Sequence, residues 1–158
     1  MTAAPPIVLS NDLKSLLAYL NLAEADCCWL ALSHVQGFTP LINQCHLNAL
    51  IQKRFAGGTI VYGWLLWEDA AAETCEAMFH SVWRDDDGVM CDITPRVDGE
   101  LKVLFVPDPN RQIIFFVGTA GPTLYSYDNV RVRDGKLPPH VAQVKFVVKA
   151  GLVASFEL

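Results

Sequence analysis

The sequence predicts an α+β protein in which N-terminal helices pack on an antiparallel sheet, and three observations indicate this fold class. The chain has 158 residues, the length of one ordinary domain, and no linker or repeat divides residues 1–158. Between Ser10 and Gly58 the apolar residues recur with the 3.6-residue period of a helix. Beyond Gly58 the period becomes two, in short segments separated by turn residues. We therefore expect a single domain with helices first and a sheet second.

Two helices are expected before residue 40. Ser10 or Asn11 can cap the first, whose apolar positions follow the helical period. A second helix is expected over 23–34, with Gly37 ending it. The buried positions of the first helix are Leu13, Leu16, Leu17 and Leu20.

A third helix is expected over 43–58. Asn43 is its expected N-cap, and Gly57 and Gly58 end it. Cys45 therefore falls in the first helical turn. The expected buried stripe consists of Leu47, Leu50, Ile51 and Phe55.

The second half of the chain has the alternation of strands. Turn residues at 85–88 and 97–100 predict hairpins and so an antiparallel sheet. The tail 123–158 is mixed: a helix over 140–150, opened by two prolines, is preferred to a strand over 141–149. The strand-like segments are 59–68, 76–84, 88–94, 101–108 and 112–118.

Tryptophans on the first expected strand divide between its two faces. Because side chains alternate along a strand, Trp64 shares one face with Tyr62 and Leu66. Trp67 and Leu65 share the other. One of these faces could form the wall of a cleft.

Composition and charge exclude several classes of protein. Hydrophobic residues make up 52% of the chain, yet the longest apolar runs fall far short of the ~20 residues of a membrane span. The net charge is −5 and the basic residues are scattered, which argues against nucleic-acid binding. No positively charged segment precedes an apolar run at the N-terminus, so no secretory signal is expected. We expect a cytoplasmic protein with neither membrane nor nucleic acid as a partner; the oligomeric state stays open.

Three residues form a possible catalytic group. The odd number of cysteines, five, suggests free thiols, and most of these are expected to be small apolar core residues. Cys45 differs because a helix N-terminus favours a thiolate. His80 lies on an expected strand, and the turn at 85–88 brings residue 80 opposite residue 93, close to Asp92. A shift of one residue would put these two side chains on opposite faces of the sheet.

The run 79-FHSVWRDDDGVMCDITP-95 resembles the His, turn, Asp-x-Thr-Pro element of transglutaminase-like and papain-like cysteine enzymes. The order of a cysteine on a helix, a histidine on a strand and an aspartate on the next is similar too. The resemblance covers about residues 45–95, with His46 where the family usually has an aromatic or small residue. It implies a papain-like or transglutaminase-like core in which Cys45 is the nucleophile, His80 the general base and acid, and Asp92 the residue that orients the imidazole.

Oxyanion stabilisation would come from the backbone N–H of Cys45 and one side-chain amide. Gln36 is preferred because Gly37 frees its loop to approach the site, and Gln44 is the alternative. Asn48 lies one turn after Cys45 and could also line the pocket.

The favoured function is thiol-dependent acyl transfer or amide hydrolysis on a peptide, a protein or a small amide, without a cofactor. A zinc site built on Cys45, His46, His80 and Cys91 is disfavoured because the usual ligand spacing is missing, so no metal is expected. The alternatives are a non-catalytic protein-binding module on the same scaffold and a thiol that acts once, on this chain or on a partner. Acidic residues at 68–69 and 85–87 could select basic substrates.

Overall fold

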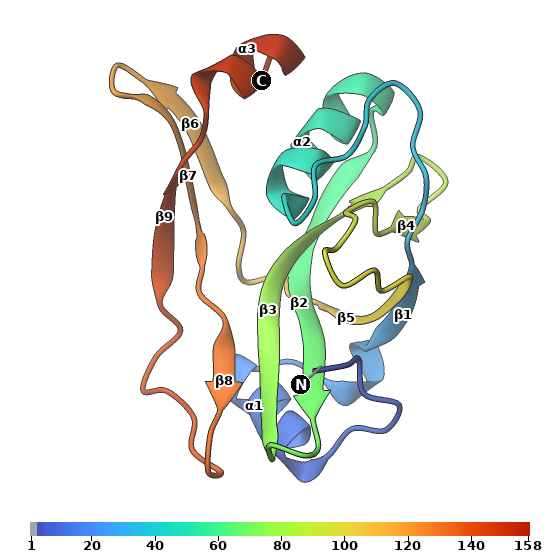
Figure 1. Ribbon diagram of the computed structural model, residues 1–158, viewed down its shortest axis with the longest axis vertical. Coiled ribbons are helices and arrows are strands. Elements are labelled where there is room, and N and C mark those ends of the chain that lie inside the picture. Colours follow the sequence, from blue (N-terminus) through green and yellow to red (C-terminus); the bar gives the residue numbers. More distant parts are fainter. Residues whose placement is uncertain (1–2) are drawn as a thin grey trace.

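A computed structural model describes residues 3–158 (Figure 1). Over these residues the chain forms three α-helices and nine strands in two antiparallel sheets, which confirms the α+β class. The larger sheet has the order β1-β5-β2-β3-β4, with β8 also paired to β3, and the smaller has the order β6-β7-β9. The helices are α1 (Asn11–Leu20), α2 (Cys45–Ala56) and α3 (Ala150–Phe156). The strands are β1 (Cys28–Ala31), β2 (Thr59–Asp69), β3 (Thr74–Arg84), β4 (Met90–Cys91), β5 (Lys102–Pro107), β6 (Ile114–Gly118), β7 (Gly121–Tyr127), β8 (Val130–Val132) and β9 (Gln143–Val147).

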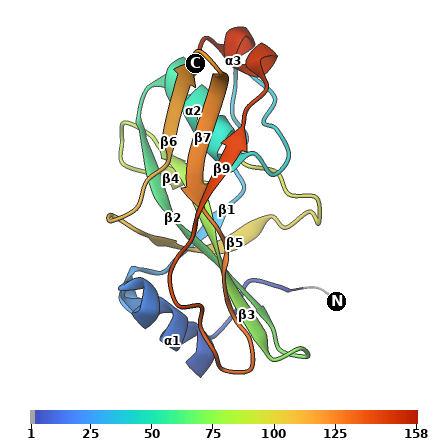
Figure 2. The same ribbon diagram turned by 90° about the vertical axis from the view of Figure 1, so that its left-hand side faces the viewer.

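Helix α2 lies between the two sheets. It packs on β3 of the larger sheet, and Figure 2 shows the smaller sheet in front of it. Helix α1 lies at the other end of β3, beside β8. The N-terminus of α2 is therefore enclosed on both sides by strands.

Helix α1 forms as the sequence predicts. The Ser10 hydroxyl accepts a hydrogen bond from the backbone N–H of Leu13 at 3.2 Å, which satisfies one free donor of the first turn. Asn21 ends the helix in the left-handed conformation. The four leucines of its apolar stripe are at most 1% exposed, so they anchor α1 in the main core.

Helix α2 begins at Cys45, and its N-cap is Gln44. The predicted N-cap, Asn43, lies one residue too early: its φ is 57° and its backbone N–H bonds to the carbonyl oxygen of Pro95. Gly57 ends the helix, as predicted. Phe55 is 53% exposed and stacks on Phe38, so the predicted buried stripe is wrong at its last position.

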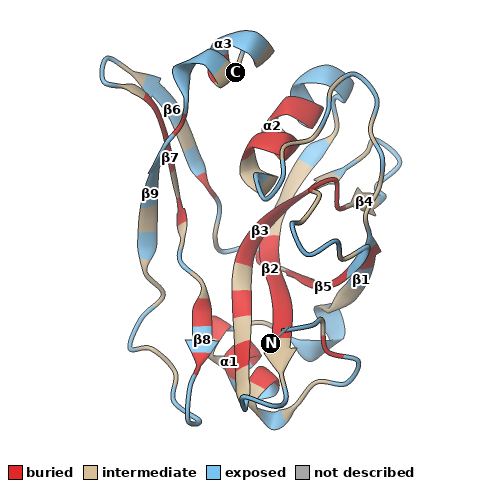
Figure 3. Cartoon of the chain, viewed as in Figure 1, coloured by how far each residue is buried: buried red, intermediate tan, exposed pale blue. Residues whose placement is uncertain are grey.

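Strands β2 and β3 form the centre of the molecule (Figure 3). They pair over their whole lengths, from Thr59 opposite Arg84 to Asp69 opposite Thr74. The predicted alternation of β2 is confirmed: Trp64 and Leu66 belong to the main core, and Leu65 and Trp67 to a second cluster on the other face.

Two predicted helices are wrong. Residues 23–34 instead form a short 3-10 turn, Glu24–Asp26, followed by strand β1, which pairs with β5. Residues 140–150 contain strand β9, paired with β7, and helix α3 starts only at Ala150. In both places pairing with a strand distant in sequence outweighs the local helical pattern.

The two predicted hairpins have different outcomes. The turn at 85–88 joins β3 to β4, although β4 is much shorter than the predicted strand 88–94. The turn at 97–100 is present, with Gly99 N–H bonded to Arg96 oxygen, but it does not make a hairpin. Strand β5 pairs with β1 and β2 instead of β4.

No helix within residues 3–158 combines the length and the hydropathy required to cross a bilayer.

Candidate active site

Cys45 is the first residue of α2, and its thiol is only partly buried. Burial alone would raise the pKa of this thiol, but the neighbouring imidazoles of His46 and His80 outweigh burial through charge and hydrogen bonding. The pKa of Cys45 is therefore well below its ordinary value. The helix N-terminus favours the same anion.

Three of the other cysteines contrast with Cys45. Burial raises the pKa of Cys27 and of Cys75 to about 11, and it also raises the pKa of Cys28. A lowered pKa makes Cys45 the candidate among these cysteines for nucleophilic chemistry.

His80 lies on β3 opposite Gly63 and is 3% exposed. Its Nε2 donates to Asp92 Oδ1 at 3.1 Å, and Nδ1 takes no part in this bond. Burial opposes a charge on this ring, but Cys45 and Asp92 raise the pKa of His80 to about 10. The favoured state is a thiolate beside an imidazolium, the form in which a cysteine attacks.

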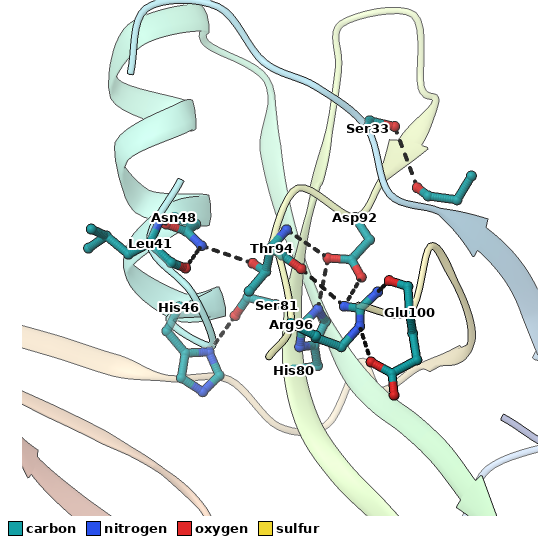
Figure 4. A network of polar contacts seen from close by, with 11 residues as sticks. Ser33, Leu41, His46, Asn48, His80, Ser81, Asp92, Thr94, Arg96 and Glu100 are labelled. Atoms are coloured by element: carbon teal, nitrogen blue, oxygen red, sulfur yellow. Dashed lines mark hydrogen bonds and ion pairs between the residues drawn. The ribbon is translucent and has the colours of Figure 1, made fainter. Parts of the chain in front are cut away.

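Asp92 is fully buried and anchored on several sides (Figure 4). Its carboxylate accepts hydrogen bonds from His80, from Arg96 Nη1 at 2.7 Å and from the Thr94 backbone N–H at 3.1 Å. Burial would raise the pKa of Asp92, but the charges of His80 and Arg96 lower it to about 2. The residue is thus a permanent anion that fixes the orientation of the His80 ring.

The His80–Asp92 contact forms although the predicted pairing is off by one. Trp83 pairs with Cys91 and Arg84 with Met90, a register that would put residue 94 opposite His80. Strand β4 ends at Cys91, so Asp92 leaves the ladder and its carboxylate reaches the ring from there.

His46 is a second imidazole beside the thiol. Its Nδ1 lies 2.6 Å from Ser81 Oγ, and its Nε2 lies 2.8 Å from Ser126 Oγ (Figure 4 shows the first contact). These bonds connect α2 with β3 and β7. From sequence, His46 was expected only as a departure from the resembled family and as a poor metal ligand. Its place next to Cys45 in the first helical turn is the signal that could have identified it.

The predicted oxyanion residues lie in three different places. Gln36 and Gln44 are exposed, and neither lines the cavity that contains Cys45 and His80. Asn48 is buried, with its Nδ2 donating to Leu41 oxygen and to Thr94 Oγ1. Both donors of the Asn48 amide are used in this way, so it fixes the loop before α2.

Asn43, which is exposed, is the residue with a side-chain amide among those that line the cavity. Its backbone has a φ of 57°, in the left-handed region that asparagine tolerates. Among the described residues the Asn43 amide has no hydrogen-bond partner, so it is available to a ligand. The sequence analysis took Asn43 only as a helix cap.

The cavity beside the thiol has a volume of about 490 Å³. Apolar side chains of β2 and β3 and three carboxylates contribute to it, and Thr94 and Arg96 lie next to the catalytic candidates. Its lining residues are Ala3, Asn43, Cys45, Leu65, Trp67, Glu76, Met78, His80, Thr94, Arg96, Val97, Asp98 and Glu100.

In the part of the chain that the structure describes, no three histidine, cysteine, aspartate or glutamate side chains are grouped to hold a metal ion. His46 Nδ1 and Nε2 contact serines, and His80 Nε2 contacts Asp92. Three of the four ring nitrogens of His46 and His80, the histidines of the suggested zinc site, thus contact protein oxygens.

Comparisons with protein-family models, with curated proteins and with solved structures found no match for this chain. The resemblance to transglutaminase-like and papain-like enzymes is therefore a hypothesis that depends on the residues and geometry described above.

Proposed function

We propose that this protein catalyses acyl transfer or hydrolysis at an amide through a covalent intermediate on Cys45. The observation that carries the proposal is the thiol of lowered pKa beside a buried imidazole that is bonded to a buried carboxylate. The order and chemistry of these residues also resemble the cysteine enzymes named above. Substrates would be peptides, proteins or small amides, and the reaction needs no cofactor.

In the first half of the reaction the Cys45 thiolate attacks the amide carbonyl carbon, and the carbonyl oxygen becomes an oxyanion. The Cys45 backbone N–H and the Asn43 amide are the donors on the cavity wall that could stabilise this charge. The His80 imidazolium gives its proton to the leaving nitrogen as the C–N bond breaks. A thioester on Cys45 and a free amine result.

In the second half neutral His80 takes a proton from water or from an acceptor amine, which attacks the thioester. The C–S bond breaks, and the products are an acid or a new amide together with the thiolate and the imidazolium. Asp92 keeps the ring in one orientation throughout and stabilises its positive charge.

The test is labelling by iodoacetamide across a pH series, with the modified cysteines identified by peptide mass spectrometry. Cys45 should label with an apparent pKa well below the ordinary thiol value of about 8.5, and His80→Ala should raise that pKa. His140→Ala, which removes an exposed histidine, is the matched control and should change nothing. Equal and slow labelling of all cysteines at neutral pH would contradict the proposal.

Catalysis itself is tested with an activated ester such as p-nitrophenyl acetate. The enzyme should release one equivalent of p-nitrophenol in a burst and carry an acetyl group on Cys45. Cys45→Ala should abolish the burst, and His80→Ala should slow it by about 10²-fold or more.

A protein-binding module is the second candidate function. The smaller sheet favours it, because neighbouring apolar side chains on one face are exposed, with Ile114 at 55%, Phe116 at 53% and Val147 at 84%. A protein that binds partners through this face without a reactive thiol would give neither the labelling profile nor the burst.

A further inference from the structure

We propose that the cavity beside Cys45 binds the long cationic side chain of a lysine or arginine residue in a peptide. For its chemical consequence this inference rests on the proposed function, because it names the substrate of the same site. The binding itself requires no reaction. Three features of the cavity argue for the cationic side chain, and a fourth argues for a peptide.

The first feature is a strip of residues that leads away from the imidazole. His80, Met78 and Glu76 occupy alternate positions of β3 and therefore face the same side of the sheet. They line the cavity together. At about 3.3 Å per residue the strip from His80 to Glu76 is about 13 Å long. A ligand side chain that lies along it therefore belongs to a residue close to the amide that would react.

The second feature is the chemistry of that strip. Met78 pairs with Leu65 and Glu76 pairs with Trp67, so each of these two β3 residues has an apolar partner on β2. Leu65 and Trp67 are 1% and 7% exposed and form an apolar floor. A methylene stem would lie on this floor with its charged end among the carboxylates that line the cavity, the arrangement that lysine and arginine side chains adopt on apolar surfaces.

The third feature is the charge of the cavity. Three carboxylates line it, Glu76, Asp98 and Glu100, against a single guanidinium, that of Arg96. The guanidinium is already bonded to Asp92 and lies 3.9 Å from Glu100. When Asp92, the partner of Arg96, and Arg131, the partner of Glu76, are counted as well, four carboxylates face two guanidinium groups. Two negative charges remain in excess, which favours a cationic ligand.

The carboxylates differ in how far they are engaged. Glu76 pairs with Arg131 and Asn129, neither of which lines the cavity. Asp98 is exposed in the turn after Arg96 and forms no hydrogen bond or ion pair with any residue in 3–158. Asp98 is thus the free carboxylate of the rim. The acidic residues at 68–69 and 85–87, which the sequence suggested for this role, do not line the cavity.

A buried donor without a partner, on a residue that lines the cavity, favours a peptide over a simple amine as the ligand. The indole N–H of Trp67 is buried and finds no acceptor within the described chain. A buried donor without a partner costs about 1–3 kcal/mol, and an acceptor oxygen on the ligand would remove that cost. A peptide residue supplies such a carbonyl oxygen together with the cationic side chain, whereas an alkylammonium ion does not.

The experiment measures binding to the Cys45→Ala variant by calorimetry at low ionic strength, so that no reaction occurs. The probes are the peptides acetyl-Ala-X-Ala-amide in which X is lysine, arginine, norleucine or glutamate, with n-butylamine as the amine lacking a carbonyl group. Lysine and arginine peptides should bind at least tenfold more tightly than the norleucine peptide. The glutamate peptide and n-butylamine should bind more weakly than the lysine peptide.

Two further variants on the same background locate the ligand. Asp98→Asn should reduce the preference for lysine over norleucine by about threefold or more, whereas Asp87→Asn, an exposed turn carboxylate outside the cavity, should not change it. Trp67→Phe should weaken the lysine and norleucine peptides by the same factor, since it removes a contact to the backbone and not to the cation.

Equal binding of the lysine and norleucine peptides, absence of binding by all peptides, or an unchanged preference in Asp98→Asn would overturn this inference. These outcomes are independent of the thiol. If Cys45 proves unreactive but the lysine preference holds, the proposed function fails and the binding site remains. If Cys45 forms an acyl intermediate without the preference, only the present inference fails.

Discussion

Asn43 has an unusual backbone conformation in the loop that leads into α2. Its φ is 57°, and its backbone N–H bonds to Pro95 oxygen at 3.0 Å. This bond connects the loop to the segment that follows Asp92. Asn43 lines the same cavity as Cys45.

We predict that Asn43→Gly lowers kcat for an amide or ester substrate by about 10²-fold and changes KM little, since an oxyanion donor acts only in the transition state. Glycine keeps the left-handed conformation without strain, so the change isolates the amide. Steady-state kinetics measure both constants. Gln36→Ala and Gln44→Ala are the controls and should retain the activity; a loss in Gln36→Ala instead would support the glutamine that the sequence favoured.

Some contacts of single residues can be predicted from the sequence, and others cannot. The contact between His80 and Asp92 was expected from residue types and from one turn, and it forms although the strand register differs by one residue. The places of Asn43 and His46 depend on bonds to Pro95, Ser81 and Ser126, which are far away in sequence. No local pattern encodes such bonds.

At the scale of the elements, β2 and β3 position the imidazole, and Gly63 determines how closely β5 approaches them. Gly63 pairs with His80 on one side and with Pro107 on the other. A Cβ at this position would lie 2.2 Å from Val106 oxygen and 2.6 Å from the Phe105 ring. Both contacts are too short, so any side chain here must push β5 away.

We predict that Gly63→Ala destabilises the protein by about 1–3 kcal/mol or more, since overpacking displaces buried backbone. Gly151→Ala is the matched control: Gly151 lies in α3, and a Cβ there meets no atom within 4 Å. It should stabilise the protein by about 0.5–1 kcal/mol. Urea unfolding gives both values, and equal effects of the two substitutions would contradict the close approach of β5 to β2.

Elements with strong local signals were predictable. The first helix has a cap and a complete leucine stripe, and the turn at 85–88 joins two strands as expected. The segments 23–34 and 140–150 have weak helical patterns, and both contain strands that complete a sheet by pairing with β5 or β7. Strand pairing of this kind depends on where the partner strand lies in the fold, and the sequence of the segment alone does not contain that information.

At the scale of the whole molecule, polar contacts connect α2 to both sheets. His46 contacts Ser81 on β3 and Ser126 on β7, and both serines are buried. Asn48 joins the same helix to Thr94. His46 therefore has two roles. Its charge lowers the pKa of the Cys45 thiol, and its hydrogen bonds connect α2 to the two sheets.

The buried carboxylate makes stability depend on pH in a predictable direction. The pKa of Asp92 falls from an ordinary value of 3.8 to about 2 in the folded protein. The unfolded chain therefore binds a proton at a higher pH than the folded protein does. The stabilisation is fully present above about pH 4 and is lost as the pH falls toward 2, with an order of magnitude of about 2 kcal/mol.

We predict that Asp92→Asn removes this component: the variant should be less stable at pH 6, and its free energy of unfolding should decline less between pH 4 and pH 2 than that of the wild type. Urea unfolding at fixed pH values measures the difference. Asp87→Asn changes an exposed carboxylate and should reproduce the wild-type decline. If Asp92→Asn and the wild type lose stability in parallel on acidification, Asp92 is not the anion that holds His80, and the charged state proposed for Cys45 and His80 loses its support.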